Sequence, residues 1–228
     1  EGIAKVLASA GARVVCAARR ASEIERVAEE INAAGGRALA CATDVTDAQA
    51  VQGLADFAVS EFGGLHMWVN NAGGSSVQRA LHKLDREEWD RTLLLNLTAV
   101  WECTRIAAAT MESGRILNIS SLAAEDVIPG SGHYSAAKAG VNMLTKTFAQ
   151  ELGPRIRVNC IMPGAVPTEI MMKALRLEED DLPNLEQMLK LPAGRLGTPT
   201  DLGAAALYLL SSGAAWVTGQ NIRVSGGP

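Results

Sequence analysis

The first fifteen residues, EGIAKVLASAGARVV (1–15), set the pattern of the fold, because they combine a helix and a strand with almost nothing between them. Apolar side chains from Ile3 to Ala10 recur at the spacing of one buried helical face, and Gly11 ends the helix. The apolar stretch that begins at Arg13 then predicts a strand. Helices that alternate with strands are typical of α/β proteins.

The same alternation continues to the other end of the chain. We expect strands at 13–18, 38–43, 65–70, 115–120, 156–161 and 222–224, and helices at 22–34, 47–62, 87–110, 133–152 and after Pro199. Strands separated by helices of this length predict a parallel, doubly wound, Rossmann-like sheet with helices on both faces. Only the polar segment 165–198, which includes RLEEDDLP, departs from the alternation, and it is typical of a mobile flap within a single domain over 1–228.

The composition excludes several classes of protein. The 228 residues are 48% hydrophobic and carry a net charge of -4, and no cluster of lysine and arginine is present that could follow a nucleic-acid backbone. No apolar run approaches the roughly 20 residues that cross a bilayer, so no membrane partner is expected. The four cysteines lie far apart without a C-x-x-C pair, which favours buried thiols in a reducing cytoplasm and predicts neither zinc nor disulfides.

The ends of the predicted strands are the places to look for a ligand, because α/β sheets bind ligands at the carboxyl edge. The strand at 65–70 runs into NNAGG, where Asn70 and Asn71 supply amides and Gly73 lets the backbone approach a ligand closely. A polar turn is the simpler interpretation of this stretch taken alone. The strand at 38–43 ends in DVTD, where Asp44 is placed to face a ligand and Asp47 to cap the next helix.

The strongest chemical signal is the pair Tyr134 and Lys138 in YSAAK, which project from one face of a helix. A neighbouring ammonium lowers the pKa of a phenol, so we expect Tyr134 to exchange a proton near neutral pH. Ser121, at the end of the strand before that helix, has a hydroxyl suited to holding a substrate oxygen, with Ser120 as its competitor. Asn96 lies inside the apolar helix LLLNLTAVW, where an amide needs partners, as a functional group or as a satisfied core residue.

Taken together, these residues resemble the short-chain dehydrogenase/reductase family. NNAG at 70–73, Asn96, a serine at 121, YSAAK at 134–138 and PGAVPT at 163–168 occur in that family's order and spacing, over essentially the whole chain. The resemblance implies hydride transfer between a nicotinamide cofactor and a carbon that bears oxygen, without a metal. It also implies that Tyr134 is the general acid/base and that Lys138 lowers the pKa of Tyr134 and holds the nicotinamide ribose. Ser121 would orient the substrate, and Asn96 would anchor a water of the proton relay.

The same resemblance implies where the cofactor binds. The adenosine side would be lined by Asp44, Val45, Asn70, Ala72 and Gly73, and the nicotinamide side by Pro163, Gly164, Val166 and Thr168, besides Tyr134 and Lys138. Relatives that prefer NAD usually have an aspartate at the end of the strand that here ends near Ala18. The chain has Arg19 and Arg20 after that position, so we expect NADP(H) to be preferred, with Arg19 as the main reader of the 2′-phosphate and Arg20 as the second.

The substrate is less sharply indicated. In the family, the segment after the proline-glycine motif closes over the substrate, so Ile170, Met171 and Leu175 are expected to form an adaptable apolar wall. Such a wall favours an apolar secondary alcohol or ketone. NNAGG, PGAVPTE and AAWVTGQNIRVSGG are similar to bacterial 7α-hydroxysteroid dehydrogenases and almost as similar to 3-oxoacyl-carrier-protein reductases. The acidic stretch LEEDD at 177–181 speaks mildly against an acidic carrier protein as partner.

Two further expectations concern other roles and assembly. A catalytically silent relative that only binds cofactor or serves as a scaffold is the alternative from another class, although the complete set of four candidate catalytic residues weighs against it. Relatives commonly form tetramers, so we expect a homotetramer or dimer through the helices at 87–110 and 134–152 and the last strand. Trp89, Trp101 and Trp216 are candidates for such interfaces, with burial in the core as the other possibility.

The family pattern also places a strand and a glycine-rich turn before the residue that matches Glu1. That turn would cradle the cofactor pyrophosphate at the start of the first helix, and its strand would lie between the strands at 13–18 and 65–70. We therefore expect the functional protein to be longer at this end by about 10–20 residues.

Overall fold

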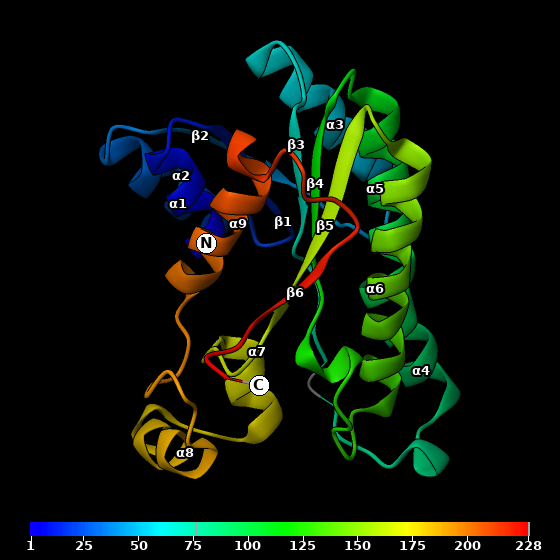
Figure 1. Cartoon of the computed structure of the whole chain (residues 1–228), viewed down its shortest axis with the longest axis vertical. Helices are drawn as coiled ribbons and strands as arrows, with labels where there is room; N and C mark the ends of the chain where they lie inside the picture. The colour runs from blue at the N-terminus through cyan, green and yellow to red at the C-terminus, as the bar shows by residue number, and fades with distance from the viewer. Residues whose placement is uncertain (76, 228) are drawn as a thin grey trace.

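The computed structural model describes residues 1–75 and 77–227, and strands and helices alternate along the chain (Figure 1). The strands are β1 (Arg13–Ala18), β2 (Arg37–Ala42), β3 (Met67–Asn70), β4 (Gly114–Ile119), β5 (Ile156–Pro163) and β6 (Asn221–Val224). The α-helices are α1 (Gly2–Ser9), α2 (Ala21–Ala33), α3 (Ala48–Phe62), α4 (Arg86–Leu93), α5 (Ala99–Thr110), α6 (Gly132–Leu152), α7 (Glu169–Leu175), α8 (Leu182–Leu189) and α9 (Pro199–Leu210). The expected fold class, α/β with parallel strands, is confirmed.

All the strand pairs in the described residues are parallel, and they form two sheets. One sheet is β1-β2, and the other has the order β3-β4-β5-β6. The described residues contain no ladder between β1 and β3, which is the position where a further strand is expected from the family pattern. That expectation stays a prediction.

Helices cover both faces of the larger sheet, because successive side chains of its strands point in opposite directions. On β4, Ile116 packs in a core with residues of α3, α5 and α6, whereas its neighbour Leu117 packs in a second core with residues of α1 and α9. Both side chains are at most 1% exposed. Figure 1 shows α5 and α6 on one side of the sheet and α1 and α9 on the other. The doubly wound arrangement therefore rests on two separate apolar layers.

Two helical segments differ from the expectations. The segment 165–198 is more helical than its polar sequence indicates, since it contains α7, α8 and a short 3-10 helix at Glu179–Asp181. The helix expected at 87–110 is interrupted, because residues Leu94–Thr98 form a π-helix between α4 and α5. Among residues 1–75 and 77–227, no helix combines the length and apolar character needed to span a bilayer.

Candidate active site

Tyr134 and Lys138 both lie on α6, which begins at Gly132. The Lys138 Nζ lies 5.6 Å from the centre of the Tyr134 ring and donates a hydrogen bond of 2.8 Å to the carbonyl oxygen of Ile119. Because Ile119 is the last residue of β4, this bond fixes the lysine at the carboxyl end of the sheet. Lys138 is 3% exposed, so its ammonium is held in a largely dry environment.

Burial dominates the electrostatics of this pair. It lowers the pKa of Lys138 to about 8, because the charged ammonium loses its hydration. It also raises the pKa of Tyr134 above its ordinary value, while the nearby Ser121 hydroxyl acts in the opposite direction. In this structure the pKa of Tyr134 is therefore raised, and not lowered as expected for a phenol beside an ammonium. The ammonium is directed at the Ile119 carbonyl, and desolvation of the phenol decides its pKa.

The structure separates the roles of the two adjacent serines. Ser120 is 3% exposed, and its hydroxyl donates to the backbone carbonyl of Lys138 at 3.0 Å. Ser121 is less buried, accepts from the amide of Ala123 at 3.1 Å, and lies within reach of the Tyr134 phenol. Ser120 is thus engaged in packing, and Ser121 is the serine that faces Tyr134.

Asn96 lies in the π-helix and is completely buried. Its Oδ1 accepts from the amide of Gly74 at 2.7 Å, and its Nδ2 donates to the carbonyl oxygens of Gly74 at 3.1 Å and Thr92 at 3.0 Å. The side chain thus takes the place of backbone hydrogen bonds on both the loop and the helix. A π-helical turn at a satisfied, buried amide is a local departure of the kind found at functional sites.

The NNAGG segment passes so close to Asn96 and Lys138 that only glycine fits at position 73. A Cβ atom on Gly73 would lie 2.8 Å from Asn96 Oδ1 and 3.2 Å from Lys138 Nζ. The next residue is packed just as closely, because a Cβ atom on Gly74 would lie 2.9 Å from Cγ2 of Ile170. The loop therefore joins the candidate catalytic residues to the cleft beside them.

A cleft of about 530 Å³ runs from this loop to the end of β1. Several expected cofactor residues lie together in its wall, namely Arg19, Arg20, Asp44, Val45, Ala72 and Gly73. Residues that were not predicted from the sequence also line it, including Thr43, Ser75, Glu88, Arg91, Thr92 and Lys173. Those from α4 carry no signal in the sequence, because only the fold brings this helix to the cleft.

The two arginines at the end of β1 differ in their partners. Arg20 forms an ion pair of 3.2 Å with Glu169 at the start of α7, whereas no ion pair of Arg19 occurs among the described residues. Asp44, beside them, has its pKa lowered chiefly by hydrogen bonds from the amide and hydroxyl of Thr46. Arg19 is consequently the guanidinium at the cleft without a carboxylate partner in the described part of the chain.

Asn70 lies elsewhere than expected. Its side chain is buried, and its Nδ2 donates to Thr104 Oγ1 at 2.9 Å and to Asn118 Oδ1 at 2.8 Å. These bonds connect β3 to α5 and β4, so the amide belongs to the core and does not face the cleft. The neighbouring Asn71 lines the cleft instead.

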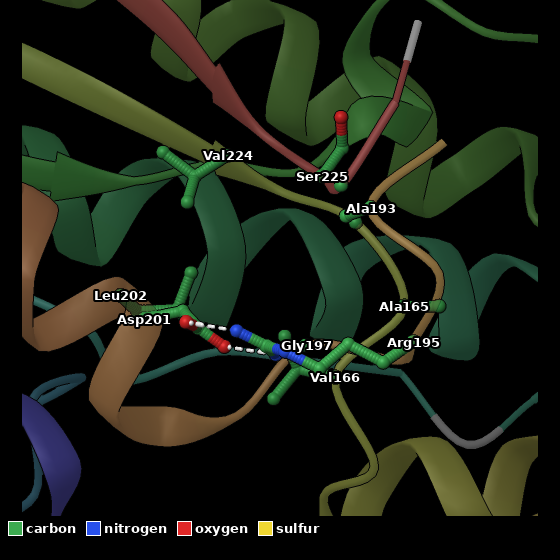
Figure 2. Close-up of a pocket in the computed structure, with 11 residues that line it drawn as sticks. Ala165, Val166, Ala193, Arg195, Gly197, Asp201, Leu202, Val224 and Ser225 are labelled. Carbon is green, nitrogen blue, oxygen red and sulfur yellow. Dashed lines mark hydrogen bonds and ion pairs between the residues drawn. The ribbon is translucent and has the colours of Figure 1, made fainter. Parts of the chain in front are cut away.

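The four residues expected on the nicotinamide side do not line one common site. Gly164 and Val166 line a separate cavity of about 190 Å³, together with the Arg195–Asp201 ion pair and Ser225 (Figure 2). The structure does not bring them to the 530 Å³ cleft. Pro163 ends β5, and the Thr168 hydroxyl caps α7 by accepting from the amide of Met171 at 3.3 Å.

The expected substrate wall on α7 is largely exposed. Ile170 is 47% and Leu175 44% exposed, and Met171 is partly buried. Ile170 lines the 530 Å³ cleft and packs on Gly74, so the flap lies close to the cofactor loop. An apolar surface is thus present on α7, although it does not enclose a pocket.

Two of the three tryptophans named as interface candidates are exposed. Trp216 is 100% and Trp101 44% exposed, whereas Trp89 is partly buried.

Within residues 1–75 and 77–227, no group of three or more metal-ligating side chains is found.

Comparison with known proteins agrees with this geometry. A family model described as Enoyl-(Acyl carrier protein) reductase, of the short-chain dehydrogenase type, matches residues 1–228. The chain is 37% identical to 7alpha-hydroxysteroid dehydrogenase of Escherichia coli K12 over 99% of this chain and 88% of the relative. It is 39% identical to 3-oxoacyl-[acyl-carrier-protein] reductase FabG of Staphylococcus aureus over 89% of this chain and 82% of the relative.

A similar solved structure is a 7 alpha-hydroxysteroid dehydrogenase complexed with NADH and 7-oxo glycochenodeoxycholic acid. It is 38% identical, with a TM-score of 0.90, over 99% of this chain and 88% of that one. A dehydrogenase/reductase from Sinorhizobium meliloti 1021 superposes with the same TM-score at 34% identity. The chain therefore belongs to the short-chain dehydrogenase/reductase family of oxidoreductases.

Proposed function

We propose that this oxidoreductase interconverts an apolar secondary alcohol and its ketone, preferably with NADP(H), and that a hydroxysteroid is the best candidate for the substrate class. The observation that carries the proposal is the meeting of Ser121, Tyr134 and Lys138 at the carboxyl end of β4. Asn96 joins them through the Gly73–Gly74 backbone, which also lines the cleft.

The residues of the cleft fit a nicotinamide dinucleotide. A Cβ atom on Gly73 would collide with Asn96 and Lys138. Because glycine has no such atom, the backbone of this loop stays open to close approach by a ligand. Arg19 supplies a guanidinium for a phosphate, and Asp44 supplies a carboxylate with a lowered pKa for hydrogen-bond donors. We propose that Arg19, Asp44, Val45, Ala72, Gly73 and Lys138 hold the cofactor.

The chain's own residues then divide the proton chemistry. When bound, the nicotinamide supplies or accepts the hydride. Ser121 orients the substrate oxygen, and Tyr134 gives or takes the proton. Because burial raises the pKa of Tyr134, its phenol is protonated at neutral pH, which is the form that ketone reduction needs. Lys138 holds the nicotinamide ribose, and Asn96 keeps one lone pair of Oδ1 for a relay water.

The preference for NADP(H) is a proposal that rests on charge at the end of β1. Arg19 and Arg20 follow Ala18 in the wall of the cleft, where an aspartate would repel a 2′-phosphate. The related 7 alpha-hydroxysteroid dehydrogenase was solved in complex with NADH, which lacks that phosphate. Substitution of Arg19 and Arg20 therefore tests the cofactor preference.

The experiment that tests the proposed function is a panel of ketones assayed for NADPH oxidation. It includes a 7-oxo steroid, simple apolar ketones and a β-ketoacyl thioester on an acidic carrier protein, with NADH as the second cofactor. We expect the apolar ketones to be reduced faster than the carrier-bound thioester, because Glu178, Glu179, Asp180 and Asp181 make the flap acidic. Preference for the thioester would support the reductase alternative, and no turnover with any ketone would support a silent relative.

Assembly and location complete the proposal. We propose a homotetramer or dimer that covers the exposed apolar residues of α5 and α6, of which Trp101 is 44% and Met143 62% exposed. Light scattering coupled to size exclusion tests this, and a monomer would contradict it. A cytoplasmic location is proposed from the four cysteines, all of which are free thiols.

A further inference from the structure

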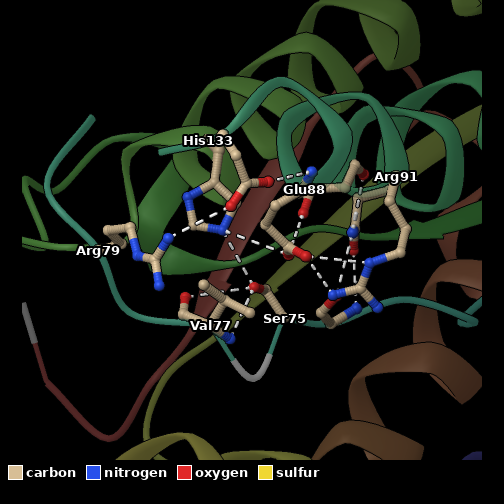
Figure 3. Close-up of polar contacts among 10 residues, drawn as sticks. Ser75, Val77, Arg79, Glu88, Arg91 and His133 are labelled. Atoms are coloured by element: carbon tan, nitrogen blue, oxygen red, sulfur yellow. Dashed lines mark hydrogen bonds and ion pairs between the residues drawn. The ribbon is translucent and has the colours of Figure 1, made fainter. Parts of the chain in front are cut away.

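His133 is a fully buried histidine that directly precedes Tyr134 on α6. Its Nε2 lies 3.1 Å from the hydroxyl oxygen of Ser75 and 4.0 Å from a carboxylate oxygen of Glu88 (Figure 3). Its Nδ1 is buried and has no hydrogen-bond partner among the described residues. The imidazole is therefore attached to its surroundings through one nitrogen alone.

This arrangement does not activate Ser75 as a nucleophile. A serine-histidine-acid triad needs the acid on the ring nitrogen opposite the serine, whereas here Ser75 and Glu88 both approach Nε2. Ser75 Oγ also lies 3.4 Å from the carbonyl oxygen of Val77, to which it donates. We accordingly assign the ring proton to Nε2, which donates to Ser75 and leaves only a lone pair on the orphan Nδ1.

The contact joins two parts of the active site. Ser75 continues the Gly73–Gly74 loop, which lines the cofactor cleft, and Asn96 holds that loop from one side through Gly74. His133 holds it at the next residue, because it anchors Ser75 to the first turn of α6. Tyr134 is the next residue on that turn, so the same hydrogen bond fixes the position of the phenol relative to the cofactor loop.

We propose that His133 is a positioning residue for the redox reaction: by donating to Ser75, it sets the distance between the loop that holds the cofactor and the phenol of Tyr134. This inference rests on the proposed function, because it assigns Tyr134 the proton transfer. Catalysis depends steeply on such distances, and misplacement by about 1 Å costs on the order of 100-fold in rate.

The surroundings of His133 make its contribution sensitive to acid. From α4, Glu88 favours the imidazolium and Arg91, which is ion-paired to Glu88, opposes it. On the loop before α4, Arg79 is paired with Asp85 at 3.2 Å, and Ser75 is the neutral partner. Burial is the largest influence and lowers the pKa of His133 below its ordinary value. The imidazole is therefore neutral at pH 7, and acid adds a proton to Nδ1, for which the described residues offer no acceptor.

The test compares His133→Phe, which cannot donate, with His133→Gln, which can, and adds Ser75→Ala and the double variant Ser75→Ala/His133→Phe. We expect kcat to fall about 10-fold in His133→Phe and Ser75→Ala, because one buried hydrogen bond is lost. The double variant should be no worse than either single one, because both remove the same contact. His133→Gln should recover most of the rate, and the fall of kcat/KM in acid that we expect for wild type should be absent from it.

Thermal melts and NADPH titrations of each variant separate positioning from loss of structure. If His133→Phe does not fold, Ser75→Ala and His133→Gln carry the test. Wild-type kcat in folded Ser75→Ala, or multiplicative losses in the double variant, would overturn the inference. Tyr134→Phe, assayed in parallel, separates failure of the proposed function from failure of the role of His133. If Tyr134→Phe still turns over, the proposed function fails. An inactive Tyr134→Phe beside a fully active Ser75→Ala refutes only the role of His133.

Discussion

Replacing Gly73 by alanine tests whether the loop is as tightly placed as the structure has it. The new Cβ atom would lie 2.8 Å from Asn96 Oδ1 and 3.2 Å from Lys138 Nζ. Neither neighbour has room to withdraw, because Asn96 is 0% and Lys138 3% exposed. Adding a methyl group to a packed site costs about 1–3 kcal/mol, and in a protein of this size each kcal/mol lowers Tm by about 2–4 °C.

Activity should fall further than stability, because the displaced groups are the ones that act on the substrate and cofactor. We expect kcat/KM to fall about 10-fold to 100-fold, corresponding to about 1–3 kcal/mol of lost transition-state stabilisation. The matched control is Gly53→Ala on the exposed side of α3, where a Cβ atom meets nothing within 4 Å. The free energy of unfolding of that control should rise by about 0.5–1 kcal/mol, because alanine is more stable than glycine in a helix interior. A Gly73→Ala enzyme with wild-type Tm and kcat/KM would refute the reasoning.

Three further predictions follow from the site and its scaffold. Arg19→Ala should raise KM for NADPH about 10-fold and leave KM for NADH nearly unchanged, and Arg20→Ala should have a smaller effect, because Arg20 is shared with Glu169; equal effects of Arg19→Ala on both cofactors would contradict the assignment. Because the pKa of Lys138 is lowered to about 8, its ammonium is lost as pH rises through that value, so kcat/KM should decline above about pH 8; a profile flat to pH 10 would show that the ammonium is not needed. Asp47→Ala removes the cap of α3, which accepts from Gln49 and Ala50, and should lower stability by about 1 kcal/mol in a denaturant titration without changing kcat; an unchanged midpoint would contradict the role of the cap.

The alternation of apolar periods predicts the α/β class and the parallel strands, because the strands of the described residues pair in parallel and most helices around them bury an apolar face. The Asp47 cap and the helix carrying Tyr134 and Lys138 lie where the sequence places them. The π-helix at Asn96 was not predictable, because it depends on the bonds that this side chain makes to Gly74, a residue distant in sequence.

Long-range packing also explains the other differences. Asn70 was expected at the ligand edge, but Thr104 and Asn118 from neighbouring elements bind its amide in the core. The raised pKa of Tyr134 depends on how deeply α6 is covered, which residue spacing does not reveal. Nothing in the sequence marks His133 beyond its place beside Tyr134, because its partner Ser75 lies 58 residues earlier in the chain.

The most direct test of the account is the turnover of Tyr134→Phe measured beside its affinity for NADPH. The substitution removes only the hydroxyl, so the cleft that contains Arg19, Asp44 and Gly73 should bind NADPH with nearly wild-type affinity. We predict that reduction of the best ketone in the panel is lost almost completely, because general acid catalysis contributes on the order of 100-fold to 10,000-fold. Wild-type turnover by Tyr134→Phe would contradict the central claim that this phenol transfers the proton.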